Sequence, residues 1–356
     1  MPDIVRFPGK GYLAFLLAGS GLSFSHYIKC LDRHLEIIAL CPYVSYISFV
    51  NTCILLGTVC NVSKKIESDL EIVLKSLSYF DSVKIFLVES DSSDSTIEVL
   101  ESIKSKNPNF NYRSLGHLRS DFPDRIERIR FSRNEYIQYI RSLNAIEIPD
   151  YVIIADLDGM NGKLTQKAIQ SCFVRSDWDA VFSNQRGGYY DILALRHDLW
   201  QPMDYNLELE WYRSLVIPKR PNYLGFYESL RLRLDYDRAR YLAIYRKMLR
   251  FEVTQPWIEV NSAFGGIGIY KPEVFLKYDY SSDFESGGGS SEHVSLHSKM
   301  RRDGLKLFIN PSFINGGWNT YNINRFFLIR QARQLVWNSK SIYKALAFTR
   351  KLIQKS

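Results

Sequence analysis

The chain has 356 residues, of which 46% are hydrophobic and 24% are charged, and these values are ordinary for a globular protein of one large α/β domain or two smaller ones. Its net charge of +8 is equalled by the eight basic residues of segment 325–356, which contains no acid. The rest of the chain is therefore neutral overall, and the charge excludes a basic nucleic-acid-binding core. We expect no nucleic-acid partner.

The cysteines and the apolar segments indicate the cellular compartment of the protein. Five cysteines without a C-x-x-C pair argue against a disulfide framework or a zinc cluster and fit a reducing compartment. The N-terminus lacks the charged-then-apolar pattern of a secretory signal. The uncharged segment 37–63 is long enough to span a bilayer, but Pro42 and Asn51 interrupt it, and its last part favours a buried strand. We expect a cytoplasmic protein, with the inner face of the membrane as a further location.

Residues 1–50 have no role that the sequence indicates, and a regular pattern begins at Ile54. Strands at 54–61 and 83–88 alternate with helices at 63–77, with Ser63 as N-cap, and at 97–106. This unit predicts parallel strands joined by right-handed crossovers. Ligands bind beyond the carboxyl ends of such strands in open α/β sheets.

A polar run follows the second strand and contains candidate nucleotide contacts. Asp94, Ser95 and Thr96 are best explained as caps of the next helix. Glu89 lies at the carboxyl end of its strand and is a candidate for a ribose hydroxyl or a base N–H. We assign Asp91, from the same run, to the nucleotide site with Glu89.

Four arginines lie in segment 125–134, just before a helix predicted at 135–143. Arginine makes bidentate contacts with phosphate, and a helix N-terminus adds free N–H donors. Arg133 and Asn134 stand at that junction, so we assign both to the diphosphate. The alternative is an exposed basic helix face.

The segment Tyr151–Gly159 predicts a buried strand that ends in Asp156 and Asp158. Mg²⁺ and Mn²⁺ bind carboxylate oxygens and commonly bridge to substrate phosphates. The two acids are therefore candidate metal ligands, and Asp156 also belongs to the diphosphate site. The alternative is a solvated turn.

The order of these segments resembles the nucleotide-binding half of GT-A glycosyltransferases. The resemblance rests on Cys60-Asn61-Val62, the run 88–96, Ser132-Arg133-Asn134 and Ile154-Ala-Asp-Leu-Asp158, and it covers residues 54–160. It is closer to the fungal capsule mannosyltransferases and related bacterial enzymes than to the largest inverting family. The resemblance implies a nucleotide-sugar donor and a divalent metal at a D-x-D motif. Glu89-Ser90 stands where many members have paired aspartates.

The second half of the chain is expected to bind the acceptor. A strand is predicted at 178–184, followed by a turn at Gly187-Gly188 and a second strand at 189–196. The resemblance implies that Asp191, on the second strand, contacts a sugar hydroxyl. The alternative for Asp191 is a salt bridge to Arg186 or Arg196. Residues 200–256 are predicted to be a helical insertion with a basic amphipathic helix at 230–251. The glycines of 261–270 fit the floor of an acceptor pocket, and those of 287–289 fit a flexible loop.

A helix is predicted from Glu292 to about Asp303. By the resemblance, Glu292 is the base that deprotonates the acceptor hydroxyl, and His293 or His297 supplies a third metal contact. The alternative for Glu292 is a charge favoured by the helix dipole. A strand at 307–311 follows, and Trp318 and Tyr321 are candidates to close the pocket. The basic, aromatic tail 325–356 suits either an anionic membrane face or packing on the domain.

We therefore predict a GT-A-like α/β fold, a mostly parallel central sheet flanked by helices with helical additions. The N-terminal segment 1–50 precedes a catalytic domain at 51–324, with nucleotide-binding half 51–160 and acceptor half 161–324, and the tail 325–356. The expected activity is transfer of a sugar from a nucleoside diphosphate sugar to a hydroxyl of a glycan or lipid-linked acceptor, with Mn²⁺ or Mg²⁺, in surface glycan or polysaccharide synthesis. The alternatives are a Mg²⁺-dependent nucleotidyltransferase and a non-catalytic glycan-binding or membrane scaffold.

Overall fold

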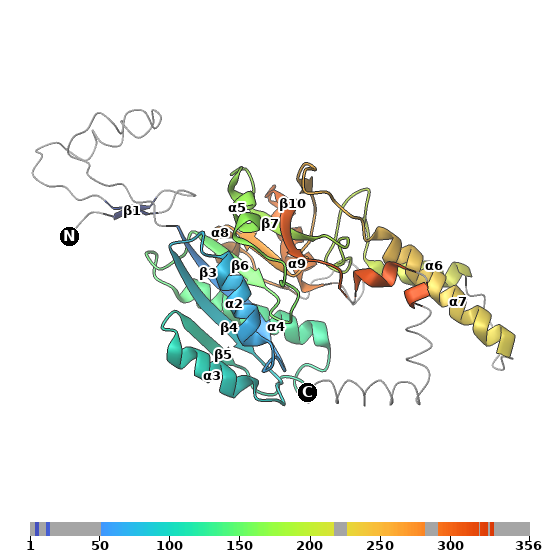
Figure 1. Cartoon of the computed structure of the whole chain (residues 1–356), viewed down its shortest axis with the longest axis horizontal. Helices are drawn as coiled ribbons and strands as arrows, with labels where there is room; N and C mark the ends of the chain where they lie inside the picture. The colour runs from blue at the N-terminus through green and yellow to red at the C-terminus, as the bar shows by residue number, and fades with distance from the viewer. Residues whose placement is uncertain are drawn as a thin grey trace, which may run out of the picture.

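A central eight-stranded sheet with helices on both faces organises the molecule (Figure 1). The computed structural model describes residues 4–6, 12–14, 51–216, 226–281, 291–319, 321–326 and 328–330. The predicted tail beyond residue 330, the glycine loop 287–289 and most of segment 1–50 lie outside the described residues. Within the described residues, no helix is long and apolar enough to cross a membrane.

The strands of the central sheet follow the order β5-β4-β3-β6-β9-β7-β10-β8. Their bounds are β3 Thr52–Val59, β4 Ser82–Glu89, β5 Phe110–Ser114, β6 Tyr151–Ala155, β7 Ala180–Gln185, β8 Ile258–Glu259, β9 Ile267–Tyr270 and β10 Leu307–Gly316. β9 is antiparallel to both β6 and β7, β8 is antiparallel to β10, and every other pair is parallel. The predicted mostly parallel α/β fold is therefore confirmed. A separate hairpin pairs β1 Ile4–Arg6 with β2 Tyr12–Ala14.

Most of the helices bury one face each against the sheet. The longer helices are α2 Ile66–Ser76, α3 Thr96–Lys106, α4 Arg125–Ser142, α6 Tyr205–Val216, α7 Phe226–Ala243 and α9 Glu292–Arg302, and the shorter ones are α5 Gln166–Gln170 and α8 Glu273–Lys277. Helices α2, α3, α4, α5, α8 and α9 bury one face each against the sheet, whereas α6 and α7 do not. Single 3₁₀ turns lie at η2 Ser171–Phe173, η3 Tyr245–Lys247 and η4 Asn322–Arg325.

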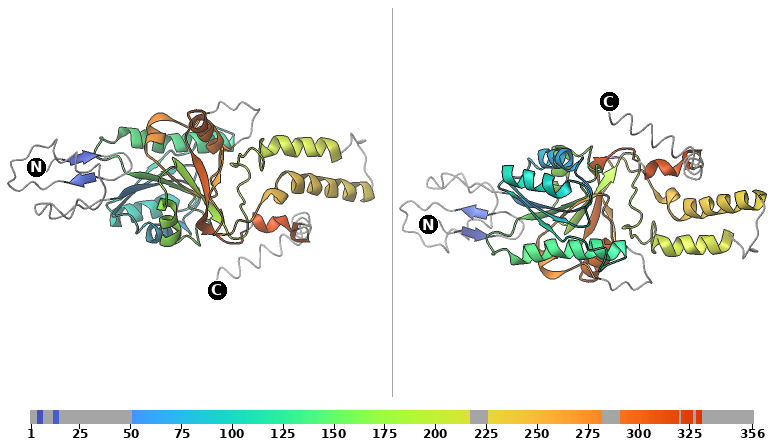
Figure 2. Two further views of the ribbon diagram at one scale, coloured as in Figure 1. Left: turned by 90° about the horizontal axis from the view of Figure 1, so that it is seen from above. Right: turned by 90° about the horizontal axis from the view of Figure 1, so that it is seen from below.

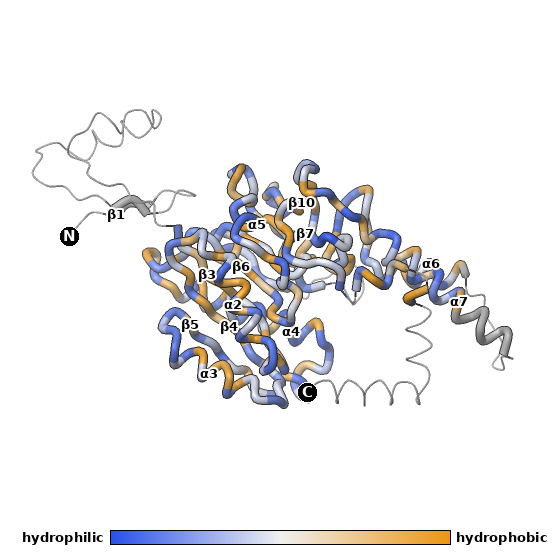
Figure 3. The backbone as a smooth tube through the Cα atoms, in the orientation of Figure 1, coloured by the Kyte–Doolittle hydropathy of each residue, from blue (hydrophilic) through white to orange (hydrophobic). Residues whose placement is uncertain are grey.

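Two apolar cores form because side chains alternate along each strand. In β3, Ile54 and Leu56 enter one core, which α4, α8 and α9 cover, whereas Cys53 and Leu55 enter the other, which α2, α3 and α5 cover. A strand buried on both faces has no polar position until it ends. Apolar residues therefore fill the middle of the strands (Figure 3), and the acids Glu89 and Asp156 come at the end of β4 and just after the end of β6, at one edge of the sheet.

Several predicted boundaries are wrong. α4 begins at Arg125, ten residues before the prediction, because Asp124 caps it by accepting hydrogen bonds from the N–H groups of Ile126 and Glu127. α2 begins at Ile66, and Ser63 does not cap it; its hydroxyl donates to Asp94 instead. Segment 189–196 is a loop and not a strand, because its apolar side chains do not alternate between two faces but are buried in one core.

The insertion expected at 200–256 is a two-helix arm that projects from the sheet (Figure 2). α6 and α7 pack together near the sheet through Leu209, Ala239 and Ala243. α7 ends at Ala243, so the predicted continuous helix 230–251 is wrong: the 3₁₀ turn η3 and an irregular segment follow. The strand predicted at 307–311 is confirmed as the first half of β10.

Candidate functional site

A cleft of about 440 Å³ opens at the carboxyl ends of β3, β4 and β6. Its lining comes from the loops after these strands, from α4, from loop 189–196 and from the start of α9. Seven of the predicted site residues line it: Asp91, Arg133, Asp156, Asp158, Asp191, Glu292 and His293. Residues from distant parts of the sequence therefore meet in one cavity.

Asp156 is held at the end of β6 by its backbone. Its N–H donates to the Gly266 carbonyl at 2.9 Å, and its own carbonyl accepts from the Asn161 side chain at 2.6 Å. Gly266 has φ of +97°, a conformation that favours glycine. The predicted glycine turn of 261–270 thus fixes the backbone of the predicted metal ligand.

The Asp156 carboxyl is poorly solvated. Burial raises its pKa, Arg133 lowers it and the neighbouring Asp158 raises it, and the net result is a pKa of about 7 against an ordinary 3.8. The side chain is 35% exposed, but that surface opens into the cleft. A cation bound there would favour the ionised form.

Arg133 lies between two acids of the cleft. Its Nε is 2.9 Å from Glu292 Oε1, and its Nη2 is 3.5 Å from Asp156 Oδ1. The Nη1 group donates to the Tyr136 hydroxyl at 3.1 Å, and the guanidinium lies over the Phe264 ring at 5.3 Å. Arg133 is in the interior of α4 and not at a helix N-terminus, so the predicted contribution of free helix N–H donors at this residue is wrong.

His293 is a buried imidazole without hydrogen-bond partners. Neither ring nitrogen has one, although Nε2 is 3.7 Å from Glu292 Oε1, and the ring stacks on Phe264 with centroids 4.0 Å apart. Burial, aided by Arg133, lowers its pKa well below the usual value, so the ring is neutral at pH 7. By contrast, both ring nitrogens of His297 are bonded inside the protein, to Ser262 and Tyr270. Of the two histidines, only His293 retains nitrogens for a ligand.

Asp191 faces the cleft from the loop after β7. Its carboxylate accepts from the N–H groups of Gly265 at 3.1 Å and Ala194 at 3.3 Å. Burial raises its pKa, and these two donors oppose that shift. The alternative of a salt bridge to Arg186 or Arg196 is not what the structure shows, since Arg196 pairs with Asp204.

The loops after β3 and β4 form one wall of the cleft. Asn61 and Asp91 adopt left-handed backbone conformations, with φ of 54° and 60°, which asparagine and aspartate tolerate better than most residues. Asn61 connects the two loops: its side chain accepts from Ser93 N at 2.8 Å, and its N–H donates to Ser92 Oγ at 3.0 Å. Asp91 accepts from Arg119 N at 2.9 Å.

Two predicted site residues lie outside the lining of the cleft. Glu89 is 1% exposed, and its carboxylate accepts from Ser92 N at 3.0 Å and from the Ser114 hydroxyl. Asn134 forms a pair of hydrogen bonds with the Tyr280 backbone, at 2.8 and 3.0 Å. Both side chains therefore stabilise the segments around the cleft.

Some lining residues are not predicted from the sequence. Arg119, Arg125 and Arg128 line the cleft near Asp91, and Arg119 and Arg125 are exposed. The basic run 125–134 is the signal for two of them, although Arg133 and Asn134 are the residues it suggests. Phe264 carries no sequence signal, because its contacts depend on segments far apart in the chain.

The cleft contains donors that suit a divalent cation, but not a complete ligand set. Asp156, Asp158 and the unpartnered His293 are of the right chemical type. Among the described residues, however, no three His, Cys, Asp or Glu side chains are close enough together to hold a metal ion. A cation here would need further ligands from the oxygens of a substrate, as is usual for Mg²⁺ bound with phosphates.

No protein-family model and no curated protein matches the chain. Among solved structures, it is similar to the mannosyltransferase PcManGT from Pyrobaculum calidifontis in complex with GDP-Man and Mn²⁺, at 13% identity and a TM-score of 0.42 over 80% of the chain. It is also similar to glucosyl-3-phosphoglycerate synthase from Mycobacterium tuberculosis in complex with UDP (12%, 0.34, 75% of the chain) and to S. aureus TarS 1-349 (8%, 0.37, 82% of the chain). The matches span 61%, 69% and 66% of those three chains. These similarities do not assign the chain to a family.

Proposed function

We propose that the protein is a metal-dependent glycosyltransferase that uses a nucleoside diphosphate sugar and a hydroxyl acceptor. One observation carries the proposal: Arg133 lies between Asp156 and Glu292 in a cleft at the carboxyl edge of the sheet. Such a cleft is where open α/β sheets bind nucleotides. The cleft combines Asp156 as a ligand for a metal ion, the guanidinium of Arg133 for phosphate, and Glu292 for proton transfer.

The donor would extend across the cleft. The wall formed by the loops after β3 and β4 would hold the nucleoside, and the diphosphate would lie near Asp156 and Asp158. Mn²⁺ or Mg²⁺, bound by these acids and by phosphate oxygens, would neutralise charge on the leaving diphosphate. His293 is the candidate for a further metal contact, and Asp191 for a hydroxyl of the sugar.

The transfer step then requires a proton acceptor. In an inverting reaction, the acceptor oxygen forms a bond to the anomeric carbon while the bond to the diphosphate oxygen breaks, and the electron pair leaves with the diphosphate. Glu292 would take the proton of the acceptor hydroxyl. Arg133, whose Nε lies 2.9 Å from Glu292 Oε1, would stabilise the charge of the leaving phosphate.

The decisive experiment measures thermal unfolding with a panel of nucleoside diphosphates, with and without Mn²⁺. A ligand that binds only the folded state must raise the midpoint. We expect one nucleotide to raise it in the presence of Mn²⁺, and Asp158→Ala to abolish the rise. No rise with any nucleotide would contradict the proposal and favour a non-catalytic scaffold. Release of pyrophosphate from a nucleoside triphosphate would identify a nucleotidyltransferase instead.

A second experiment separates catalysis from binding. Glu292→Gln keeps the size of the side chain but removes the base, so we expect sugar transfer to fall at least a hundredfold while the nucleotide-dependent rise in midpoint persists. Glu259→Gln is the matched control. Glu259 lies on the edge strand β8, pairs with Arg301 of α9, and does not line the cleft. Equal loss in both variants would argue against a catalytic role for Glu292.

The expected role in surface glycan synthesis, the lipid-linked acceptor and the location at the inner membrane face remain parts of this proposal. The transfer assay tests the acceptor when it compares free glycans with lipid-linked glycans, and fractionation of cells into membrane and soluble parts tests the location.

A further inference from the structure

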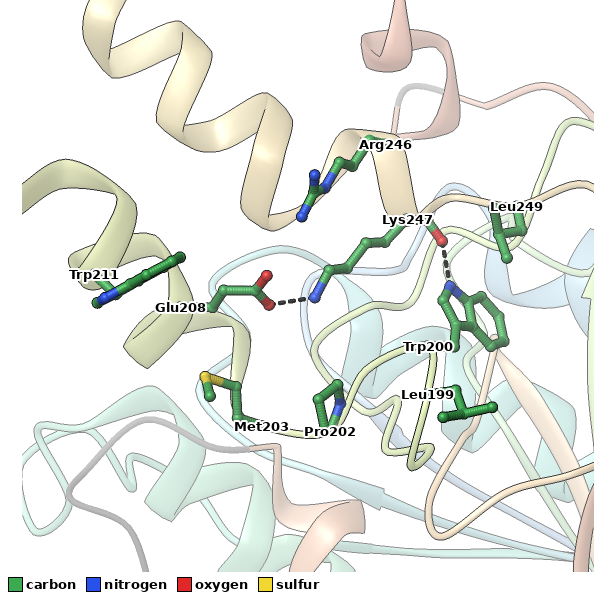
Figure 4. A pocket seen from close by; sticks show the side chains of 9 residues that line it. All are labelled: Leu199, Trp200, Pro202, Met203, Glu208, Trp211, Arg246, Lys247 and Leu249. Carbon is green, nitrogen blue, oxygen red and sulfur yellow. Dashed lines mark hydrogen bonds and ion pairs between the residues drawn. The ribbon is translucent and has the colours of Figure 1, made fainter. Parts of the chain in front are cut away.

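A groove of about 730 Å³ lies where the two-helix arm meets the sheet domain. Most of its lining is apolar, with Leu199, Trp200, Met203, Trp211 and Leu249 around the buried Glu208–Lys247 ion pair (Figure 4). Leu199 and Trp200 belong to the chain segment that begins with Asp191 and Leu193 in the cleft. A short segment therefore connects the proposed active site to this groove.

The groove continues into a line of exposed apolar side chains on the arm. Met203, Leu207, Trp211 and Leu215 follow at intervals of four residues, and those within α6 therefore share one face of the helix. We call these four residues the α6 stripe. Trp211 is 55% and Leu215 61% exposed, and Leu199 at the groove is 92% exposed. Large apolar side chains gathered in this way mark interaction surfaces.

The charges of the arm are distributed unevenly between its interior and its surface. Three acids are buried in ion pairs: Asp204 with Arg196, Glu208 with Lys247 and Asp237 with Arg330. Among the described side chains of residues 199–253, the exposed basic ones are Arg238, Arg240, Arg246 and Arg250, and the exposed acids are Glu210 and Glu252. Arg250 and Glu252 pair with each other, so the described surface of the arm carries three further exposed arginines against one further exposed acid.

The second helix of the arm repeats this combination of apolar, aromatic and basic groups. Leu234, Arg238 and Tyr241 are spaced by four and three residues, which places them on one face of α7, and all three are exposed. Aromatic residues beside arginines are typical of the boundary between lipid headgroups and acyl chains.

We propose that the arm docks onto an anionic lipid bilayer, with the α6 stripe and Leu199 in the headgroup region. In the headgroup region, the apolar side chains would be removed from water, and the exposed arginines would contact the negatively charged lipid headgroups. Charge complementarity favours this partner over a second copy of the chain, because a symmetric contact between two arms would bring the arginines of both copies together. The binding does not depend on sugar transfer.

The test is sedimentation of the full-length protein with vesicles of phosphatidylcholine alone or with 30% phosphatidylglycerol. We expect binding to the anionic vesicles, accompanied by a blue shift of tryptophan emission, and little binding to neutral ones. Trp211→Ser/Leu215→Ser should weaken the binding by about tenfold or more. The control is Val174→Ser, which removes a still more exposed apolar side chain, 78% exposed, from the sheet domain.

The charge contribution is tested separately. Arg238→Glu should weaken binding to anionic vesicles by several fold. Lys167→Glu, which reverses a positive charge at an exposed position of α5, should not weaken this binding. Equal binding to neutral vesicles, or full binding by the double serine variant, would overturn the proposal. A dimer in equilibrium sedimentation that the double variant dissociates would identify a second copy as the partner instead. All variants should retain the nucleotide-dependent rise in midpoint, so failure here is distinguishable from failure of the proposed function.

Discussion

Replacing Asp156 with asparagine should stabilise the metal-free protein at neutral and alkaline pH. The pKa of Asp156 is raised to about 7 from 3.8, so the folded state binds a proton more tightly than the unfolded state. The stability that comes from the neutral carboxyl is complete below about pH 4 and is lost as the pH rises through about 7. An asparagine at this position would be neutral at every pH and would not undergo this loss.

The magnitude follows from the size of the shift. A shift of about three pKa units corresponds to a ceiling of about 4 kcal/mol. About a third of the side chain is open to solvent in the cleft, which screens the effect, so we expect a gain of about 1–2 kcal/mol at pH 8 that shrinks toward pH 5.

The assay is urea denaturation in EDTA at several values between pH 5 and 8.5. Asp121→Asn, which removes a carboxylate from an exposed residue that does not line the cleft, is the control and should stay within about 0.5 kcal/mol of the wild type. When Mn²⁺ and the nucleotide are added, the wild type should become more stable than Asp156→Asn, because only the wild type retains the carboxylate that binds the metal. If Asp156→Asn is less stable than the wild type by the same margin at pH 5 and pH 8, the argument from burial is refuted.

Two further predictions concern packing away from the reacting groups. Gly57→Ala should destabilise the fold by about 1–3 kcal/mol, because its Cβ would lie 2.9 Å from the Ala155 carbonyl oxygen. Gly162→Ala, whose Cβ would have no neighbour nearer than 3.9 Å, should change the denaturation midpoint little. Lys247→Met should cost about 3–5 kcal/mol, because it leaves the buried Glu208 without its cation. A double variant with Glu208→Met should recover most of that loss, and a double variant as unstable as the single one would contradict this explanation.

The edge of the sheet that carries the proposed active site was predictable because buried parallel strands have a simple pattern. An apolar run that ends in polar residues fixes both the strand and the position of its carboxyl end, as Tyr151–Gly159 does for Asp156. The start of α4 was missed, because the four arginines of 125–134 suggested a phosphate-binding junction before the helix. Arg133 was therefore assigned to the site with the wrong local structure.

The partners of the site residues depend on tertiary contacts that spacing does not encode. The i, i+4 spacing of His293 and His297 places both on one face of α9, yet Ser262 and Tyr270 bond only the second ring. Glu89 was correctly placed at the edge, but Ser114 on the neighbouring strand β5 bonds its carboxylate inside the wall. Such differences arise from pairings between distant segments, which a single sequence does not show.

The position of β9 has a consequence for how the chain folds. β9 lies between β6 and β7, and its partner residues in β6 precede it by more than 100 residues. During synthesis, β6 therefore keeps an unpaired edge until residue 270 has emerged, and closure of this long loop slows folding. A fragment that ends near residue 160 would expose that edge to other chains and aggregate. Residues 51–160 and 161–324 are thus expected to fold as one cooperative unit.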